Sequence, residues 1–531
     1  MTRTERYFAI QSAGLCEKIV PLFLALLLAG ISGCMENSSQ NERSDSADHR
    51  APNIIYILAD DLGYGELGVY GQEKIETPHI DGLASAGMKF TQHYSGSAVC
   101  APSRYMLMTG KHPGNAYIRG NDELPQRGDI GSFAEMLENP SLEGQRPIPS
   151  NTVTLGELLQ SVGYTTAAIG KWGLGGPCSS GHPNEQGFDF FYGYLCQRQA
   201  HTYFPTHLWK NKERVYLDND LVPPHQSLPE EAAPYDPVSY KPYHEQPDYA
   251  AELMHSETIK FIDKQGESPF FLYLPTPIPH VSLQAPQRWI DYYVNKFGEE
   301  EPYPGGSYVP VRYPNATYAA MISYLDEQVG EIVEKLKAKD LYENTLIIFT
   351  SDNGPTFTGG VDPEYFDSAA PFKSTYGWGK GFLREGGIRV PMIAAWKRYI
   401  PEGSVSEHLS AFWDVLPTLS EITGFQLPDD SDGISFLPVL KGLDEDQKKH
   451  EYLYWEFPGY GGQQAVRMGR WKAVRLNLKE NPNAPVELYN LDVDLREQNN
   501  VANQFPEIVK EMELIMKREH TPSELFPLLP E

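Results

Sequence analysis

The most informative segment of the 531-residue chain is Asn53-Ile-Ile-Tyr-Ile-Leu-Ala59, a continuous apolar run that ends at Asp60-Asp61. A run of this kind, followed by polar residues, is typical of a strand that is buried on both faces of a sheet. Three further segments show the same pattern: 345–350 before Ser351-Asp352-Asn353-Gly354, 270–274 before a proline-rich turn and His280, and 163–169 before Gly170-Lys171. These four segments predict four central strands.

Stretches with helical spacing of apolar residues lie between the strands, at 80–86, 154–161, 249–264 and 318–339. This alternation predicts an α/β fold with a doubly wound, mixed but mostly parallel sheet flanked by helices. Further on the pattern changes, with short strands expected at 451–455, 464–468, 471–475 and 487–490 and an amphipathic helix at 506–518. We therefore expect a catalytic α/β domain at 51–425 and a smaller antiparallel-sheet-plus-helix subdomain at 426–531.

The composition excludes several classes of protein. The chain has 44 Lys+Arg against 71 Asp+Glu, a formal net charge of −27, so it repels nucleic acid and is not expected to bind it. Its 40% hydrophobic and 12% aromatic content is sufficient for a large folded core. If the substrate is an anion, the binding site must reverse this negative field with a few local cations.

The N-terminus has the features of an export signal. Basic residues precede an apolar run at 19–29, which is short for a transmembrane span and is interrupted by Pro21. Ile31-Ser-Gly-Cys34 resembles a bacterial lipobox, which implies removal of residues 1–33 and lipidation of Cys34, with ordinary signal cleavage as the alternative. The polar segment 34–50 is then a tether. We expect an exported lipoprotein, anchored to the outer membrane on its periplasmic or cell-surface face and touching the membrane only through its lipid.

Four oxygen-bearing side chains follow two of the predicted strands: Asp60, Asp61, Asp352 and Asn353. In a parallel sheet the carboxyl ends of the strands converge on the ligand. Three carboxylates brought together repel one another unless a cation neutralises them. Because all four groups are hard oxygen donors, we expect a Ca²⁺ site, with Mg²⁺ less favoured.

Three cysteines remain after the signal and the lipobox. Cys178 and Cys196 are close in sequence and can pair in an oxidising compartment, which leaves Cys100 to be explained. A buried free thiol is the plain alternative for Cys100.

The segment that begins at this cysteine reads Cys100-Ala-Pro-Ser103-Arg104-Tyr-Met-Leu-Met-Thr109-Gly110 and resembles the signature of the sulfatases. Other segments agree with this family of the alkaline phosphatase superfamily, namely ADDLGYGELG, SDNG and EGGIRVP, and the resemblance covers roughly 51–520. It is nearest to the bacterial polysaccharide sulfatases. The resemblance implies that a formylglycine-generating maturation enzyme converts Cys100 to formylglycine.

The resemblance also implies the roles of several residues in hydrolysis of a sulfate ester. The formylglycine at position 100 would be a ligand of the metal, and its hydrate would attack sulfur. Arg104 would hold the hydrate, while Lys171 and Lys380 would bind sulfate oxygens. His280 is expected to be the general acid, and Lys380 could also protonate the bridging oxygen.

One position departs from the family pattern. Many relatives have a histidine where this chain has Gly173, so the base that triggers sulfate release is open, with His93 and His201 as candidates that could also bind substrate. Rings in 201–209 could stack on a sugar, although packing is an equally good reading. The expected substrate is a sulfated sugar of galactose type or another algal or mucosal glycan. Two alternatives are a phosphonate or phosphodiester hydrolase and a non-catalytic glycan-binding lipoprotein.

Overall fold

The computed structural model describes residues 50–529. The predicted signal segment, Cys34 and nearly all of the predicted tether lie outside these residues. Within 50–529, no helix combines the length and the apolar character that a membrane crossing requires. The described residues form one compact unit that begins at Arg50.

Ten strands form the main sheet, in the order β11-β2-β10-β9-β1-β8-β4-β5-β6-β7. The five central strands from β9 to β5 are parallel, whereas β10, β6 and β7 run antiparallel to their neighbours. This confirms the predicted mixed, mostly parallel sheet. The strand bounds are β1 Asn53–Ala59, β2 Met88–Phe90, β4 Thr165–Lys171, β5 Phe190–Tyr194, β6 His207–Lys210, β7 Glu213–Tyr216, β8 Phe270–Pro275, β9 Thr345–Ser351, β10 Met392–Ala395 and β11 Ser404–Ser406. A separate short pair joins β3 (His93–Tyr94) and β12 (Ser410–Ala411).

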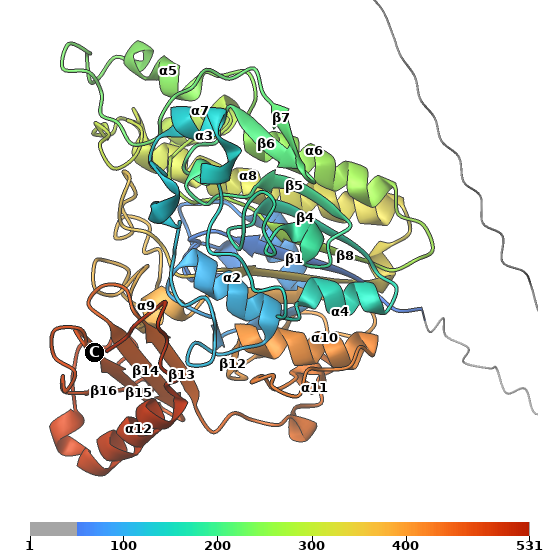
Figure 1. Ribbon diagram of the computed structural model, residues 1–531, viewed down its shortest axis with the longest axis vertical. Coiled ribbons are helices and arrows are strands. Elements are labelled where there is room, and N and C mark those ends of the chain that lie inside the picture. Colours follow the sequence, from blue (N-terminus) through green and yellow to red (C-terminus); the bar gives the residue numbers. More distant parts are fainter. Residues whose placement is uncertain (1–49, 530–531) are drawn as a thin grey trace, which may run out of the picture. The chain divides into compact units, whose positions relative to one another are not determined.

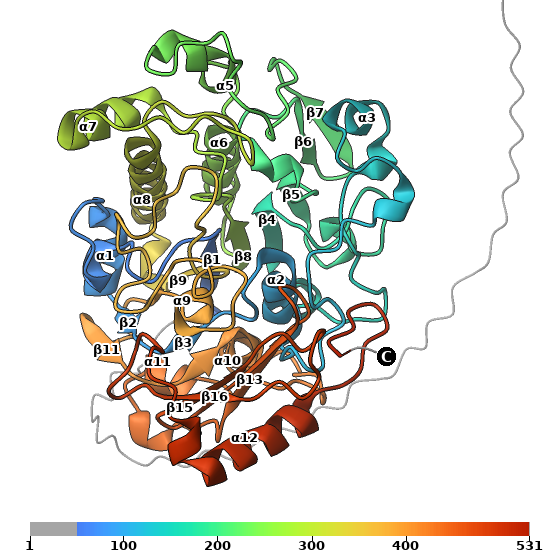
Figure 2. The same cartoon turned by 90° about the vertical axis from the view of Figure 1, so that its left-hand side faces the viewer.

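Helices cover both faces of this sheet, as Figures 1 and 2 show. Alternate residues of β1 enter two different cores, because side chains of a strand alternate between its faces. Ile55 and Ile57 pack on the side of α1, α6, α7 and α8, while Tyr56 and Leu58 pack on the side of α2, α4, α10 and α11. The helix bounds are α1 Pro78–Ser85, α2 Cys100–Thr109, α3 Phe133–Glu138, α4 Leu155–Ser161, α5 Lys241–His244, α6 Ala250–Asp263, α7 Gln287–Phe297, α8 Pro314–Ala338, α9 Glu385–Ile388, α10 Val415–Thr423, α11 Leu437–Leu440 and α12 Pro506–Glu519.

The C-terminal part is a four-stranded antiparallel sheet with one helix, as predicted (Figure 1). Its strands are β13 (Leu453–Phe457), β14 (Gln463–Met468), β15 (Trp471–Arg475) and β16 (Glu487–Asn490), and α12 packs on them. A buried ion pair of 2.9 Å between Lys472 of β15 and Glu385 of α9 ties this sheet to the α/β part. The expected boundary between residues 425 and 426 stays a prediction.

The structure decides two points that the sequence left open. The ring-rich segment 201–209 is mostly core: Tyr203, Phe204 and Trp209 are buried, and β6 joins the main sheet, so these rings do not form a platform for a sugar. Cys178 and Cys196 are not paired but free. Cys178 is exposed whereas Cys196 is buried, so the two thiols lie in different environments despite their closeness in sequence.

Candidate active site

Polar side chains gather at the carboxyl ends of three central strands, as predicted. Asp60 and Asp61 follow β1, Asp352 and Asn353 follow β9, and Lys171 is the last residue of β4. All five are at most 1% exposed. Adjacent parallel strands end at one edge of the sheet, and β1 lies directly beside β9, which brings their carboxylates together.

Helix α2 supplies the next two groups. Cys100 is its first residue and is 2% exposed, and Arg104 lies one turn later and is fully buried. Residues four apart share one face of a helix, so both side chains point to the same place. The Cys100 thiol donates a hydrogen bond of 3.3 Å to Oδ1 of Asp60. The cysteine therefore lies against the carboxylates, as the signature predicts.

Two buried cations hold these carboxylates. Arg104 donates from Nε and Nη2 to Oδ2 of Asp352, at 3.0 and 2.8 Å, in a geometry that only a guanidinium provides. Lys171 Nζ lies 2.5 Å from Oδ2 of Asp60 and 3.6 Å from the sulfur of Cys100. Arg104 also donates to the carbonyl of Lys171, which ties α2 to the end of β4.

Asp61 gathers a second set of groups. Lys380 Nζ donates to Oδ2 of Asp61 at 2.6 Å, and Nε2 of His280 is 3.7 Å from the same oxygen. The backbone of Asp61 is left-handed, with φ of 64°, a conformation that a non-glycine residue adopts at a cost and that is frequent at functional sites. Lys380 and His280 come from loops far apart in the sequence, and the fold brings both beside Asp61.

The oxygen donors fit a divalent cation. Asn353 donates from Nδ2 to Asp61 at 2.7 Å, but its Oδ1 is buried without a hydrogen-bond partner among the described residues. A buried acceptor of this kind requires a ligand, an ion or a water. Atoms of Asp60, Asp61, Cys100 and His280 also lie within 4.8 Å of one another, close enough to surround one ion.

The pKa values of two neighbouring carboxylates of the site are shifted in opposite directions. Burial and the neighbouring Asp60 raise the pKa of Asp352 to about 7, despite the contact with Arg104. Burial would likewise raise the pKa of Asp60, but Lys171 and Arg104 lower it well below its ordinary value. Two carboxylates that share a site shift their pKa values apart in this way because their like charges repel each other. A bound cation would offset this repulsion.

The thiol and the imidazole are both neutral in this environment. Burial raises the pKa of the Cys100 thiol, with Asp60 as the second cause, so the unmodified side chain is not a reactive thiolate. Burial, Lys380 and Lys171 lower the pKa of His280 to about 3. Nδ1 of His280 faces the carbonyl of Val281, so the neutral ring keeps its proton there and Nε2 carries a lone pair.

Two further residues at this site, His225 and Tyr308, were not predicted from the sequence. The ring of His201 stacks on His280 with centroids 5.2 Å apart, and its Nδ1 lies 3.1 Å from Nε2 of His225. Tyr308 contacts the rings of His201, His225 and His280. His225 and Tyr308 lie in segments without a strong pattern, and their only signal was the presence of a histidine and an aromatic residue.

The other candidate histidine is not part of the site. His93 lies on β3 in the core, where Nδ1 is 2.9 Å from Ser410 Oγ and the ring packs on Phe412. Burial lowers its pKa to about 3. Its position seven residues before Cys100 suggested proximity, but β3 pairs with β12 and holds the side chain away. His93 is therefore a packing residue, and the prediction that it binds substrate or acts as the base is wrong.

The unusual glycine of the family motif is explained by its neighbour. A Cβ atom at Gly173 would lie 2.7 Å from the side chain of Gln197, and φ of Gly173 is +76°. A histidine at this position would therefore collide with Gln197 and strain the backbone. Gln197 accepts a hydrogen bond of 2.5 Å from Gln145, and its Nε2 is buried without a partner in the part of the chain that the structure describes.

Comparison with known proteins agrees with the geometry. A family model described as Sulfatase matches residues 52–425, and one described as N-sulphoglucosamine sulphohydrolase, C-terminal, matches residues 375–521. The N-acetylgalactosamine-6-O-sulfatase of Bacteroides thetaiotaomicron is 28% identical over 94% of this chain and 98% of its own length.

Two solved structures share the fold. Ps i-CgsB in complex with k-i-k-neocarrahexaose has a TM-score of 0.69 and 28% identity, covering 88% of this chain and 92% of the other. The phosphonate monoester hydrolase of Agrobacterium radiobacter has a TM-score of 0.58 and 19% identity, covering 90% of this chain and all of the other. The second likeness shows a common fold and no more.

Proposed function

The chain belongs to the sulfatase family and is a sulfuric ester hydrolase, and from this premise we propose that it removes sulfate groups from sugars of sulfated polysaccharides. Two observations support the substrate class. One relative is an N-acetylgalactosamine-6-O-sulfatase, and a solved structure at 28% identity was determined with neocarrahexaose. The predicted export of the chain agrees with an extracellular glycan substrate.

The nucleophile of the proposed reaction comes from Cys100. As formylglycine, this residue would supply an aldehyde hydrate, a better nucleophile for a sulfate ester than the neutral thiol. Its place at the start of α2 is enclosed by Asp60 at 3.3 Å and Lys171 at 3.6 Å. These two side chains therefore orient the group and surround it with charge of both signs, and burial excludes bulk water.

We propose that Asp60, Asp61, Asp352 and Asn353 hold a Ca²⁺ ion, together with the side chain at position 100. The unpartnered Oδ1 of Asn353 and the crowded carboxylates support this assignment. When bound, the ion would lower the pKa of the hydrate and polarise a sulfate oxygen. The oxygen-only donor set favours Ca²⁺, with Mg²⁺ as the second choice.

The cations of the chain would bind the substrate anion. Arg104 fixes Asp352 and would hold the nucleophile in place, while Lys171 and Lys380 present their ammonium groups beside Cys100 and Asp61. Charge develops on the sulfate and on the leaving oxygen as the ester bond breaks. Preorganised cations stabilise that charge without having to reorganise.

Two side chains can donate the proton that the leaving alcohol needs. Asp61 keeps Lys380 charged, since it raises the pKa of that lysine against the opposing effect of burial. His280 is neutral without substrate, and its bare Nε2 would have to gain a proton when the sulfate anion enters. We propose that His280 is the general acid once substrate is bound and that Lys380 is the second donor.

His201 is the remaining candidate for the base that releases sulfate. It stacks on His280, and its pKa is lowered by burial first and then by His280 and Lys171. A neutral imidazole can accept a proton or a substrate hydroxyl. We propose that His201 takes over a task that the family histidine performs elsewhere.

The observation that carries this proposal is the convergence of Cys100, Lys171 and Arg104 on Asp60 and Asp352. Mass spectrometry of the peptide that spans Cys100, on protein from its native cell, tests it directly. We expect the aldehyde and release of sulfate from regiospecifically sulfated galactose-type sugars, and we expect Cys100→Ala to abolish release while sparing the fold. An unconverted thiol, or turnover by Cys100→Ala, would refute the mechanism.

A phosphonate or phosphodiester hydrolase is the second candidate, because an enzyme of that class shares the fold. Relative rates on an aryl sulfate and an aryl phosphonate separate the two. A preference for the phosphonate would overturn the proposed substrate class. A non-catalytic glycan-binding protein is disfavoured by the enclosed cations around Cys100, and conversion of that residue would exclude it.

We also propose that the protein is an exported lipoprotein. The support is the sequence of residues 1–34 alone, in which a basic segment and an apolar run precede Cys34. Cys34→Ser tests the anchor. The unaltered protein is expected in the membrane fraction of its cell, and the variant is expected to leave it. Equal distribution of both proteins would contradict lipidation at Cys34.

A further inference from the structure

A pocket of about 820 Å³ lies apart from the proposed active site. It is open to solvent on one side and is lined by residues at the end of the β2–β11 edge, in the segment from Val439 to His450, in the β14–β15 turn and after β16. Within the described residues it shares no lining side chain with the catalytic set. Its volume falls in the range of sites for small organic ligands and exceeds the needs of a single small ion.

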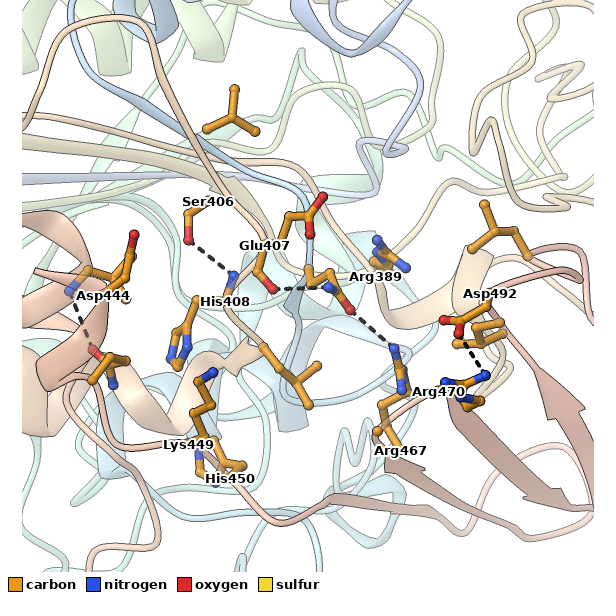
Figure 3. Close-up of a pocket in the computed structure, with 18 residues that line it drawn as sticks. Arg389, Ser406, Glu407, His408, Asp444, Lys449, His450, Arg467, Arg470 and Asp492 are labelled. Atoms are coloured by element: carbon orange, nitrogen blue, oxygen red, sulfur yellow. Dashed lines mark hydrogen bonds and ion pairs between the residues drawn. The ribbon is translucent and has the colours of Figure 1, made fainter. Parts of the chain in front are cut away.

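The charge of this pocket differs from that of the whole chain. Four cations line it against three carboxylates, whereas the chain as a whole has 44 cations against 71 carboxylates. Figure 3 shows the cations in two groups: Arg389, Arg467 and Arg470 on one side, and Lys449 with His408 and His450 on the other. With Glu385, which pairs with Arg389, the charges around the pocket balance, so the pocket lacks the negative charge by which the chain as a whole repels anions.

Two of the four arginine and lysine side chains are already paired. Arg389 contacts Glu385 at 3.1 Å, and Arg470 contacts Asp492 at 3.3 Å. The other two, Arg467 and Lys449, have no carboxylate within ion-pair distance among residues 50–529. The unpaired carboxylates of the lining, Glu407 and Asp444, belong to exposed residues, as does Lys449, whereas Arg467 is buried.

Arg467 is the clearest sign that a partner is missing. It is only 6% exposed, and its one hydrogen bond in the described chain runs from Nη2 to Gln92 at 3.1 Å. Nε and Nη1 are buried and have no partner there. Leaving donors of a guanidinium unsatisfied is costly, and such groups are usually met by a ligand, a water or an ion. Nε2 of the nearby His408 is also buried without a partner.

We propose that this pocket is a second, non-catalytic site for an anionic oligosaccharide, in which a sulfate or carboxylate group of the glycan meets Arg467 and Lys449. The oligosaccharide part of the proposal rests on the proposed function, and the anion part rests on the charges alone. A planar guanidinium matches the oxygens of either anion, and the volume leaves room for the attached sugars. Such a site would hold a polysaccharide chain beside the enzyme between successive desulfation reactions and raise the effective concentration of the chain at the active site.

Calorimetric titration of the full chain carrying Cys100→Ala tests this site, with a sulfated galactan tetrasaccharide, its desulfated counterpart and inorganic sulfate as probes. We expect two binding sites for the sulfated tetrasaccharide. Lys449→Gln should weaken one of them about tenfold, and Arg467→Gln should remove it, since contacts to charged groups are worth at least this factor. Lys510→Gln, at an exposed position of α12, removes the same charge elsewhere and should change neither site.

The outcomes separate clearly. A single binding site in the parent, or two binding sites whose affinities are unchanged in Lys449→Gln, would overturn the inference. The melting temperature of Arg467→Gln shows whether that variant is folded. Equal affinity for the desulfated tetrasaccharide would overturn the anion recognition, and equal affinity for inorganic sulfate would overturn the glycan recognition. Sulfate release by the unaltered protein is measured separately. If sulfate is released but no second binding site is found, only this inference is refuted; if a second binding site is found but no sulfate is released, only the proposed function is refuted.

Discussion

Lys171→Met tests the electrostatic part of the mechanism with little change in shape. The ammonium group of Lys171 is 3.6 Å from the sulfur of Cys100 and 1% exposed, so its charge is poorly screened at the reacting centre. At about 4 Å and an effective dielectric constant of about 20, two unit charges interact by about 4 kcal/mol. Removing one preorganised donor costs about 10²–10³-fold in kcat, which agrees with that scale.

The same substitution also affects stability. Lys171 is 2.5 Å from Asp60, and breaking a buried pair leaves a charge that costs about 3–5 kcal/mol. Arg104 remains 3.4 Å from the same oxygen, so we expect the lower end of that range in the presence of a chelator. Ca²⁺ should reduce the loss, because the cation would replace the missing charge beside Asp60.

The assay is sulfate release from an aryl sulfate, corrected for the fraction of Cys100 that mass spectrometry shows to be converted. Urea unfolding with Ca²⁺ and with a chelator gives the stability. Lys210→Met is the matched control, because Lys210 forms an exposed ion pair of 3.1 Å with Glu257 and should change stability by less than about 1 kcal/mol. A fully converted Lys171→Met enzyme with kcat within about threefold of the parent would refute the proposed role.

Three further predictions concern other residues. Burial lowers the pKa of His93 from 6.5 to about 3, so the unfolded chain binds the proton more readily and stability is lost as pH falls below 6.5. Urea unfolding should show that this residue costs about 1.5 kcal/mol between pH 6.5 and 5.0, and His93→Asn should lack this loss. If the free energy of unfolding of His93→Asn has the same pH dependence as that of the parent, the burial of His93 is contradicted. Lys472→Met should lower the free energy of unfolding by about 3 kcal/mol, the lower end of the range for a buried pair, because Arg389 still faces Glu385 at 3.1 Å. Adding Glu385→Gln should recover part of this loss, and a loss under about 1 kcal/mol would argue against the pair. Asn353→Ala should weaken Ca²⁺ binding at least about tenfold by calorimetry, and equal affinity would remove Asn353 from the metal site.

The central strands could be predicted because burial on both faces leaves a local record. Segments such as 53–59 and 345–351 are continuous apolar runs, and their polar ends identify the edge at which ligands bind. The short strands at the margin could not be predicted. Ser404–Ser406 is three residues long and only partly buried, so its sequence carries almost no pattern. Its place in the sheet depends on pairing with β2, more than 300 residues away.

The residues of the site likewise fall into those that a local motif predicts and those that it does not. The signature at Cys100 and the carboxylates at the strand ends are local motifs, and the structure brings them together as expected. The histidines behaved differently: His93, only seven residues from Cys100, faces the core, whereas His201 stacks on His280 from 79 positions away. Distance along the chain says little about distance in space once a strand turns a side chain away.

The sequence by itself therefore determined the fold class, the family and the chemical identity of the groups at the proposed active site, because each depends on a pattern within a few residues. Only the tertiary structure showed that Gln197 fills the space beside Gly173. It also showed that, among residues 50–529, Oδ1 of Asn353 and two nitrogens of the buried Arg467 have no hydrogen-bond partner. Each of these facts concerns the surroundings of one atom. Those surroundings are assembled by packing between distant segments, and no local pattern records them.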